Sequence, residues 1–112
     1  SVIGDKLNSQ FVVAVGDNFY THGIPTDQTD ARFDTTWNDV YTGDSLQTKW
    51  FVCGGNHDHS GNVTAQIAYT NENERWTFPD YYYSLLSNSK KTVSCSDSKF
   101  ASKSNFSIQF VV

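Results

Sequence analysis

The fold of this chain is decided by two stretches of sequence, which read FVVAVGDNFY over residues 11–20 and WFVCGGNHDH over residues 50–59. Each begins with a short apolar run, which is typical of a strand buried in a sheet. Each run ends at glycine and leads into a loop that carries carboxylate and amide groups with either a phenol or imidazoles. Such loops can gather their side chains around one point. The two stretches therefore predict an α/β fold with a site for a hard metal ion, a combination that suggests phosphate ester chemistry.

The size and composition of the chain fit one globular domain. It has 112 residues, of which 38% are hydrophobic and 15% aromatic. Large rings can build a core with little Leu or Ile, and this aromatic content argues against disorder. The formal net charge is −4 and no basic run is present, so we expect no binding of nucleic acid. No apolar stretch approaches the roughly 20 residues that a membrane helix needs.

Helical spacing marks two segments between and after the apolar runs. The first follows Asp30, which is placed to cap it. The apolar face of this helix would comprise Phe33, Trp37, Val40 and Tyr41. The second is a shorter helix in which Val63 and Ile67 share a face. We expect the strand over residues 11–15 to be covered on both faces.

The remaining segments predict a less regular part of the chain. Residues 1–10 resemble the end of a helix and a turn, and residues 76–79 break the pattern. Tyr81, Tyr83 and Leu85 alternate as in a strand. Residues 87–104 are polar and predict a hairpin loop with no role in the core. Residues 106–112 alternate again, and we expect them to pair with the Tyr81–Leu85 strand; because they stop at the last residue, we expect the chain to be an internal piece of a longer one.

Cysteines and glycosylation sequons give a first indication of compartment. Cys53 lies in an apolar run and is expected to be a small buried side chain, while Cys95 lies in a polar segment. A disulfide between them is one alternative that the sequence leaves open. Two sequons begin at Asn62 and Asn105, and together with the Ser-, Thr- and Asn-rich loops they favour a secretory or vacuolar route.

The first loop offers two candidate metal ligands. The two oxygens of Asp17 can each bind a cation, although an aspartate at this position can also simply cap local N–H groups. Tyr20 can bind a metal as a phenolate only if the cation is strongly Lewis acidic, as Fe³⁺ is. Its alternative role is that of a packed aromatic side chain.

The second loop offers a ligand, an acid and two supporting groups. Asn56 provides an amide oxygen, unless it only forms a left-handed turn. His57 can bind a metal, donate a proton to a departing alkoxide or serve as a hydrogen-bonded loop residue. Asp58 can orient His57 or its neighbours, and His59 can line a pocket or lie exposed. His22, near the first loop, is interpreted as a surface residue.

The combination of the two loops is more specific than either one. Gly-Asp-x-x-Tyr at residues 16–20 and Gly-Asn-His-Asp at residues 55–58 resemble the purple acid phosphatases of the calcineurin-like metallophosphoesterases. Residues 62–69 and the Arg-Trp-x-Phe-Pro stretch at 75–79 resemble the small, tartrate-resistant type. The likeness covers roughly residues 3–86.

This resemblance implies a partial four-layer αββα sandwich with mixed sheets, in which residues 1–112 form part of a single metallophosphoesterase catalytic domain that is incomplete at both ends. It also implies roles for individual residues. Asp17 would bridge two metals, Tyr20 would bind Fe³⁺ and give the purple colour, and Asn56 would bind Fe²⁺, Zn²⁺ or Mn²⁺. His57 would contact the substrate phosphate and protonate the leaving group.

The implied activity is that of an acid phosphatase, which hydrolyses phosphate monoesters by attack of a metal-bound hydroxide. The resemblance implies a glycoprotein that is secreted, lysosomal or vacuolar, and it leaves the oligomeric state open. The family's upstream Asp motif and its downstream histidine motifs have no counterpart in this sequence. We therefore expect the 112 residues alone to bind metal poorly and to be inactive. The alternatives are a phosphodiesterase or nucleotide-cleaving enzyme, and a secreted binding glycoprotein that has lost catalysis on the same scaffold.

Overall fold

The computed structural model describes residues 10–86, 91–96 and 105–110. The expected helix end over residues 1–10 lies outside this part except for Gln10, which has no regular secondary structure. Val112, the last residue of the expected terminal strand, also lies outside it.

The first sheet is parallel and contains the two apolar runs. Its strands are β1 (Phe11–Ala14), β2 (Lys49–Val52) and β3 (Trp76–Thr77), in the order β1-β2-β3. Because parallel strands end at the same edge of a sheet, the loops after β1 and β2 emerge side by side. The expected α/β class is confirmed, whereas the interpretation of residues 76–79 as a break was wrong in part because Trp76–Thr77 pairs with β2.

The expectation that the first strand is covered on both faces was also wrong. All four residues of β1 are half-buried, and Val15, just beyond the strand, is 60% exposed. The reason is the position of β1 at the edge of the three-stranded sheet. The inner strand β2 buries Trp50 and Val52 instead.

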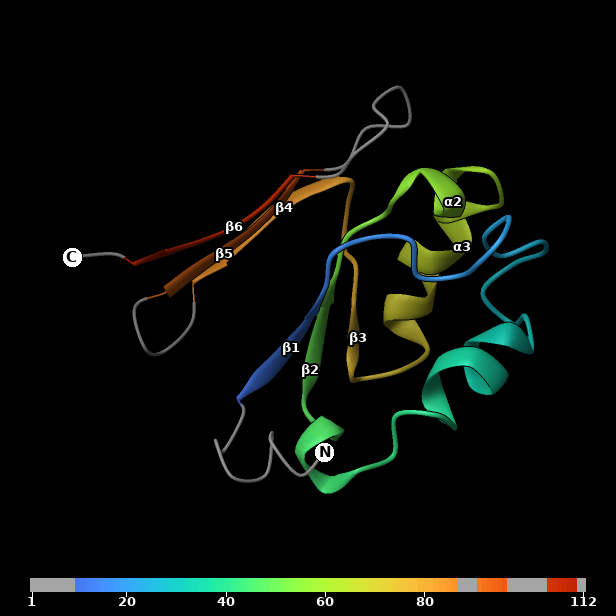
Figure 1. Ribbon diagram of the computed structural model, residues 1–112, viewed down its shortest axis with the longest axis horizontal. Helices are drawn as coiled ribbons and strands as arrows, with labels where there is room; N and C mark the ends of the chain where they lie inside the picture. Colours follow the sequence, from blue (N-terminus) through green and yellow to red (C-terminus); the bar gives the residue numbers. More distant parts are fainter. Residues whose placement is uncertain (1–9, 87–90, 97–104, 111–112) are drawn as a thin grey trace.

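Short helical segments cover one side of this sheet (Figure 1). They are the π-helical η1 (Phe33–Asn38), the 3-10 turn η3 (Tyr69–Asn71), and the α-helices α2 (Asn56–His59) and α3 (Val63–Ala68). A further 3-10 turn, η2 (Asp44–Leu46), lies at the end of the sheet where β2 begins (Figure 1). The core between helices and sheet is built largely of rings, as the composition predicted. Its members are Phe19, Ile24, Phe33, Trp37, Trp50, Val52, Val63, Ala65, Tyr69, Trp76 and Phe78.

The helix after Asp30 is shorter than its spacing predicted. Phe33 and Trp37 are buried, and the Phe33 ring stacks on Tyr69 with 4.0 Å between ring centroids. The helix ends at Asn38, so Val40 and Tyr41 fall outside it and remain 55% and 41% exposed. The helix with Val63 and Ile67 forms as expected.

The second sheet is antiparallel and corrects two expectations. Its strands are β4 (Tyr82–Leu86), β5 (Lys91–Ser96) and β6 (Asn105–Phe110), in the order β4-β5-β6. β5 lies inside the segment 87–104 that was expected to be a loop without a role in the core. β6 pairs with β5 and not with β4, because the intervening β5 occupies the edge of β4.

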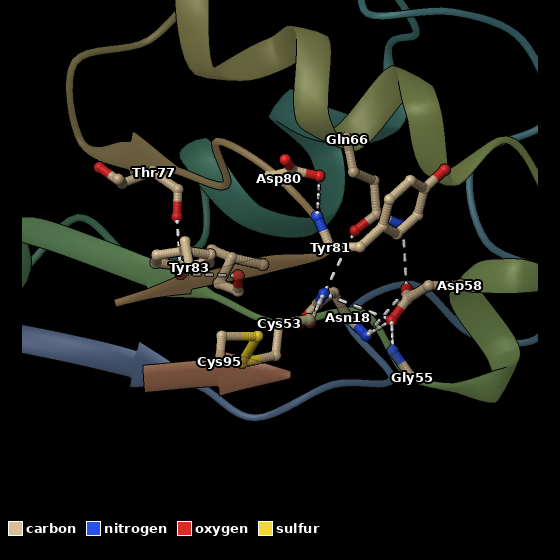
Figure 2. The surroundings of a disulfide bond; sticks show 11 residues. Asn18, Cys53, Gly55, Asp58, Gln66, Thr77, Asp80, Tyr81, Tyr83 and Cys95 are labelled. Carbon is tan, nitrogen blue, oxygen red and sulfur yellow. Dashed lines mark hydrogen bonds between the residues drawn. A yellow bond between two sulfur atoms is a disulfide. The ribbon is translucent and has the colours of Figure 1, made fainter. Parts of the chain in front are cut away.

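The two sheets are joined at the strand that leads to the second loop. Cys53, directly after β2, forms a disulfide with Cys95 of β5 (Figure 2). Cys95 is 3% exposed, so this part of β5 belongs to the interior. Figure 1 shows the second sheet extending away from the first on the side opposite the helices. The structure thus contains helices, a parallel sheet and an antiparallel sheet.

Candidate functional site

Glycines allow the loops after β1 and β2 to touch. A side chain at Gly16, whose φ is +112°, would place its Cβ 3.1 Å from the Cα of Gly55. A Cβ on Gly55 would lie 2.2 Å from Oδ1 of Asp17, which no real structure accommodates. Asp17 itself adopts a left-handed conformation with a φ of +53°. The sequence therefore permits a backbone contact that brings Asp17 onto the second loop.

Asp17 contacts both loops through its two carboxylate oxygens. Oδ1 accepts a hydrogen bond from the backbone N–H of His57, with 3.2 Å between the heavy atoms. Oδ2 lies 3.4 Å from the hydroxyl of Tyr20, which donates to it. The rings of Tyr20 and His57 are 4.8 Å apart between centroids. The structure therefore brings together three of the residues that the sequence singled out.

Tyr20 is an exposed phenol held beside a negative charge. It is 60% exposed, so the alternative of a packed aromatic side chain is wrong. The charge of Asp17 is the main reason that the pKa of Tyr20 lies above its ordinary value. In the absence of a cation the phenol stays protonated, and its hydroxyl donates a hydrogen bond to Asp17. A strongly Lewis-acidic cation would be required to turn the phenol into a ligand.

The orientation of His57 is set by a backbone carbonyl. Nδ1 lies 2.7 Å from the carbonyl oxygen of Thr21, 36 residues away in sequence. A carbonyl only accepts, so Nδ1 carries a hydrogen and Nε2 is the nitrogen left for a ligand or substrate. His57 is thus a hydrogen-bonded loop residue, and a contact with the first loop sets its orientation.

Asn56 is the first residue of α2 and lies exposed after Gly55. It has a helical conformation, so the left-handed turn considered for it does not form. It follows the residue that contacts Asp17, which puts it next to the junction of the two loops. His59 stacks on Tyr81 with 5.9 Å between ring centroids, and His22 is exposed as expected.

Asp58 is completely buried and joins the two loops through hydrogen bonds to residues of both (Figure 2). Its carboxylate accepts hydrogen bonds from the backbone N–H groups of Asn18, Phe19 and Gly55 at 2.8–3.1 Å. The side-chain amide of Gln66 donates to it as well, at 3.0 Å. Sequence reasoning missed Asn18 and Gln66. The only signal for Gln66 was that it is a polar residue within the short helix. Such a residue can equally lie on the exposed face of a helix.

The two sequon asparagines differ in what the structure shows. Asn62 is exposed and caps α3, since its Oδ1 accepts from the N–H of Ala65. Its Nδ2 donates to the carbonyl of Thr26 at 2.7 Å. Asn105 begins β6, and its side chain lies outside what the structure describes.

The available donors are oxygen atoms of a carboxylate, a phenol and an amide, on Asp17, Tyr20 and Asn56. This set suits a hard, highly charged cation, so these residues fit the metal centre that the motifs imply. They do not complete a coordination shell. Among the described residues, no group of three or more His, Cys, Asp or Glu side chains is placed to hold a metal ion. Within the same residues, no helix is long and apolar enough to cross a membrane.

Comparison with solved structures identifies the class of fold. The chain is similar to GAP50, described as the anchor in the inner membrane complex of Plasmodium, with a TM-score of 0.62 and 23% sequence identity. The similarity covers 80% of this chain and 30% of that one. At this identity it shows a shared fold and nothing more.

Comparison with curated sequences identifies the family. The chain is 48% identical over 80 residues to tartrate-resistant acid phosphatase type 5 from Oryctolagus cuniculus, and equally to that from Homo sapiens. It is 43% identical over 77 residues to purple acid phosphatase 7 from Arabidopsis thaliana. These alignments cover 67–70% of this chain but only about a quarter of each relative (23–24%). No family model matches the chain. The chain is a relative of the purple acid phosphatases, as its motifs predicted.

Proposed function

We propose that the protein containing these residues is an acid phosphatase that hydrolyses phosphate monoesters at a dinuclear Fe³⁺–M²⁺ centre. The observation that carries this proposal is the convergence of Asp17, Tyr20 and His57 at the junction of two loops. The relatives named acid phosphatases support the reaction class.

Each of the three proposed ligands supplies an oxygen donor. Asp17 would bridge the cations, since its two oxygens face different loops. Tyr20 would bind Fe³⁺, and Asn56 would bind the divalent ion, which is Fe²⁺, Zn²⁺ or Mn²⁺. When bound, such a pair supplies positive charge for the phosphoryl oxygens and activates water.

His57 would act on the leaving group. The Thr21 carbonyl occupies Nδ1, so Nε2 is the nitrogen that can contact a phosphate and pass a proton to the departing alkoxide. Such a step requires a hydrogen on Nε2 as well as on Nδ1. His59, stacked on Tyr81, would line the pocket.

The chain spans about a quarter of the length of the curated relatives it matches. We therefore propose that residues 1–112 are part of one catalytic domain, whose remaining layers complete a four-layer αββα sandwich. The remaining metal ligands would come from outside these residues. The 112 residues alone are then expected to bind metal poorly and to show no turnover.

The colour of the iron-loaded protein tests the proposal. In the natural polypeptide that contains this chain, Tyr20→Phe should abolish a visible band between the phenolate and Fe³⁺. Tyr82→Phe is the matched control, because Tyr82 is 61% exposed and lies on the second sheet. A protein that cleaves phosphodiesters or nucleotides with Mn²⁺, is colourless and is unaffected by Tyr20→Phe would establish the alternative enzyme.

A catalytically inactive binding glycoprotein is the non-enzymatic alternative. It is favoured by one observation, namely that the same fold occurs in a protein described as an anchor. Absence of both iron binding and phosphatase activity in the natural polypeptide would establish it. We propose no nucleic-acid partner, since the formal net charge is −4 and the sequence has no basic run.

We further propose a secretory, lysosomal or vacuolar location. The Cys53–Cys95 disulfide supports an oxidising compartment, and the exposed Asn62 is accessible for glycosylation. Endoglycosidase treatment of the natural protein should lower its apparent mass. Asn62→Gln and Asn105→Gln should each remove part of that change.

A further inference from the structure

The loop that carries Asp17 and Tyr20 contains no helix or strand between the end of β1 and Gly23. Its shape therefore depends on hydrogen bonds from other parts of the chain. Two charged side chains of opposite sign, Asp58 and Arg32, supply such bonds.

Asp58 holds the N–H side of this loop. Its Oδ1 lies 3.0 Å from the backbone nitrogen of Asn18 and 3.1 Å from that of Phe19. Its Oδ2 accepts from the backbone N–H of Gly55 at 2.8 Å. One buried carboxylate thus ties the first loop, 40 residues away, to the second. Hydrogen bonds to a carboxylate are stronger than those between neutral groups.

Gln66 fixes this carboxylate from α3. Its Nε2 donates to Asp58, and its Oε1 accepts from the side-chain amide of Asn18 at 3.2 Å. The same Asn18 amide donates to the carbonyl of Cys53 at 2.8 Å. Gln66 and Asp58 are both 0% exposed, so the hydrogen bond between them is shielded from water, and Asn18 is half-buried.

Arg32 holds the carbonyl side of the loop. Its guanidinium donates to the carbonyl of Gly23 at 2.6 Å and to the carbonyl of Tyr20. The same group lies 5.8 Å from the centre of the Phe19 ring. The planar fork of arginine is suited to binding two acceptors at once.

We propose that Arg32, Asp58 and Gln66 are positioning residues that set the loop geometry in which Asp17 and Tyr20 can share a cation. The Asp58 carboxylate accepts from N–H groups of the loop, and the Arg32 guanidinium donates to its carbonyls. The donors and the acceptors of the loop backbone thus each have a charged partner. None of the three is proposed to touch metal or substrate. The inference rests on the proposed function, because that function supplies the metal. The hydrogen bonds from these three residues that hold the loop, here called the clamp, can be measured in the metal-free protein.

The test uses Arg32→Gln, Asp58→Asn and Gln66→Leu in the natural polypeptide. Arg75→Gln is a matched control, since the Arg75 guanidinium also donates to backbone carbonyls, those of Tyr41, Leu46 and Asn38, at 3.0, 2.9 and 3.4 Å. The first measurement is amide hydrogen exchange of the metal-free protein. The second is the affinity for Fe³⁺, read from the growth of the visible band. Arg32→Lys provides a milder variant if the others fail to fold.

We expect Arg32→Gln, Asp58→Asn and Gln66→Leu to speed exchange at the Asn18 and Phe19 amides. We also expect them to weaken Fe³⁺ binding by roughly 10–100-fold. Arg32→Lys should give a smaller effect of the same sign, and Arg75→Gln should change neither quantity at the site. Unchanged exchange at these amides would overturn the clamp whether or not the protein binds iron. Faster exchange with unaltered Fe³⁺ affinity would overturn the positioning role. A wild-type protein that binds no Fe³⁺ would overturn both that role and the proposed function. The exchange rates of the metal-free protein would still show whether the three residues hold the loop.

Discussion

The hydroxyl of Tyr83 lies 2.9 Å from the carbonyl oxygen of Val52, so a residue of the second sheet is anchored on the strand that leads to the candidate site. The same hydroxyl lies 3.2 Å from the carbonyl of Thr77 on β3. With one proton to donate, it serves the ends of two neighbouring parallel strands. The candidate site is therefore supported by the second sheet as well as by its own loops.

Tyr83→Phe should destabilise the protein by about 0.5–1.5 kcal/mol at pH 7, because two carbonyls lose their donor. Burial raises the pKa of the Tyr83 phenol well above its ordinary value. A group whose pKa is raised on folding contributes stability that is complete below its unfolded pKa, roughly 10, and that is lost as the pH rises beyond it. Urea unfolding at pH 7, 9 and 11 measures both effects.

The difference in unfolding free energy between wild type and Tyr83→Phe should shrink between pH 9 and 11. Tyr82→Phe, which removes an exposed hydroxyl from the adjacent residue, is the control and should change stability little. A Tyr83→Phe difference that stays constant up to pH 11 would show that burial of this phenol has no energetic effect.

The disulfide makes a second connection between the sheets. Cys53 and Cys95 are separated by 42 residues, so their bond restricts a long loop of the unfolded chain. Replacing both by Ala should lower the free energy of unfolding by about 2–4 kcal/mol. A reducing agent should lower the stability of the wild type to that of the double variant and leave the double variant unchanged. Equal stability of all four samples would contradict a stabilising bond.

The sequence predicted the site loops better than it predicted their supports. Residues 11–20 and 50–59 have local patterns, an apolar run followed by glycine, that depend on neighbours in sequence. β3 is only two residues long, too short to produce a periodic pattern. Asp58 could be named a supporting residue, but its partners Asn18 and Phe19 lie 39–40 residues away. Contacts of that range follow from the tertiary fold and leave no local signal.

The disulfide and β5 illustrate the same limit. Cys95 lies in a polar segment whose alternation is weak, and its inclusion in a strand follows from pairing with β4 and β6. The pairing of Cys53 with Cys95 requires a geometry that two isolated cysteines in a sequence do not define. In contrast, the helical spacing of Phe33 and Trp37 correctly predicted them as core residues of η1. The same prediction was wrong for Val40 and Tyr41, because the helix ends before them.

Two core tryptophans should respond differently to replacement by Phe. Trp76 Nε1 donates to the carbonyl of Gln66 at 2.8 Å, whereas the buried Nε1 of Trp37 has no hydrogen-bond partner among the described residues. Trp76→Phe removes a donor from the buried carbonyl of Gln66, but Trp37→Phe removes an unsatisfied donor. Both variants lose ring volume, so we expect Trp76→Phe to cost about 1–3 kcal/mol more in urea unfolding. Equal costs would mean that packing alone determines both.

Gly55→Ala is expected to damage the site directly. The added methyl group would lie 2.2 Å from Oδ1 and 2.4 Å from the backbone nitrogen of Asp17, so the two loops must separate. Gly61→Ala is the matched control, since its methyl group would lie 2.2 Å from the carbonyl oxygen of His22, which is near the Gly23 end of the first loop and five residues from Asp17. Both variants should lose stability in thermal unfolding, but only Gly55→Ala should lose the visible band of the iron-loaded natural polypeptide. If Gly61→Ala removes the band to the same extent, the loss reflects general destabilisation, and contact between Gly55 and Asp17 is not the feature that holds the two loops in register.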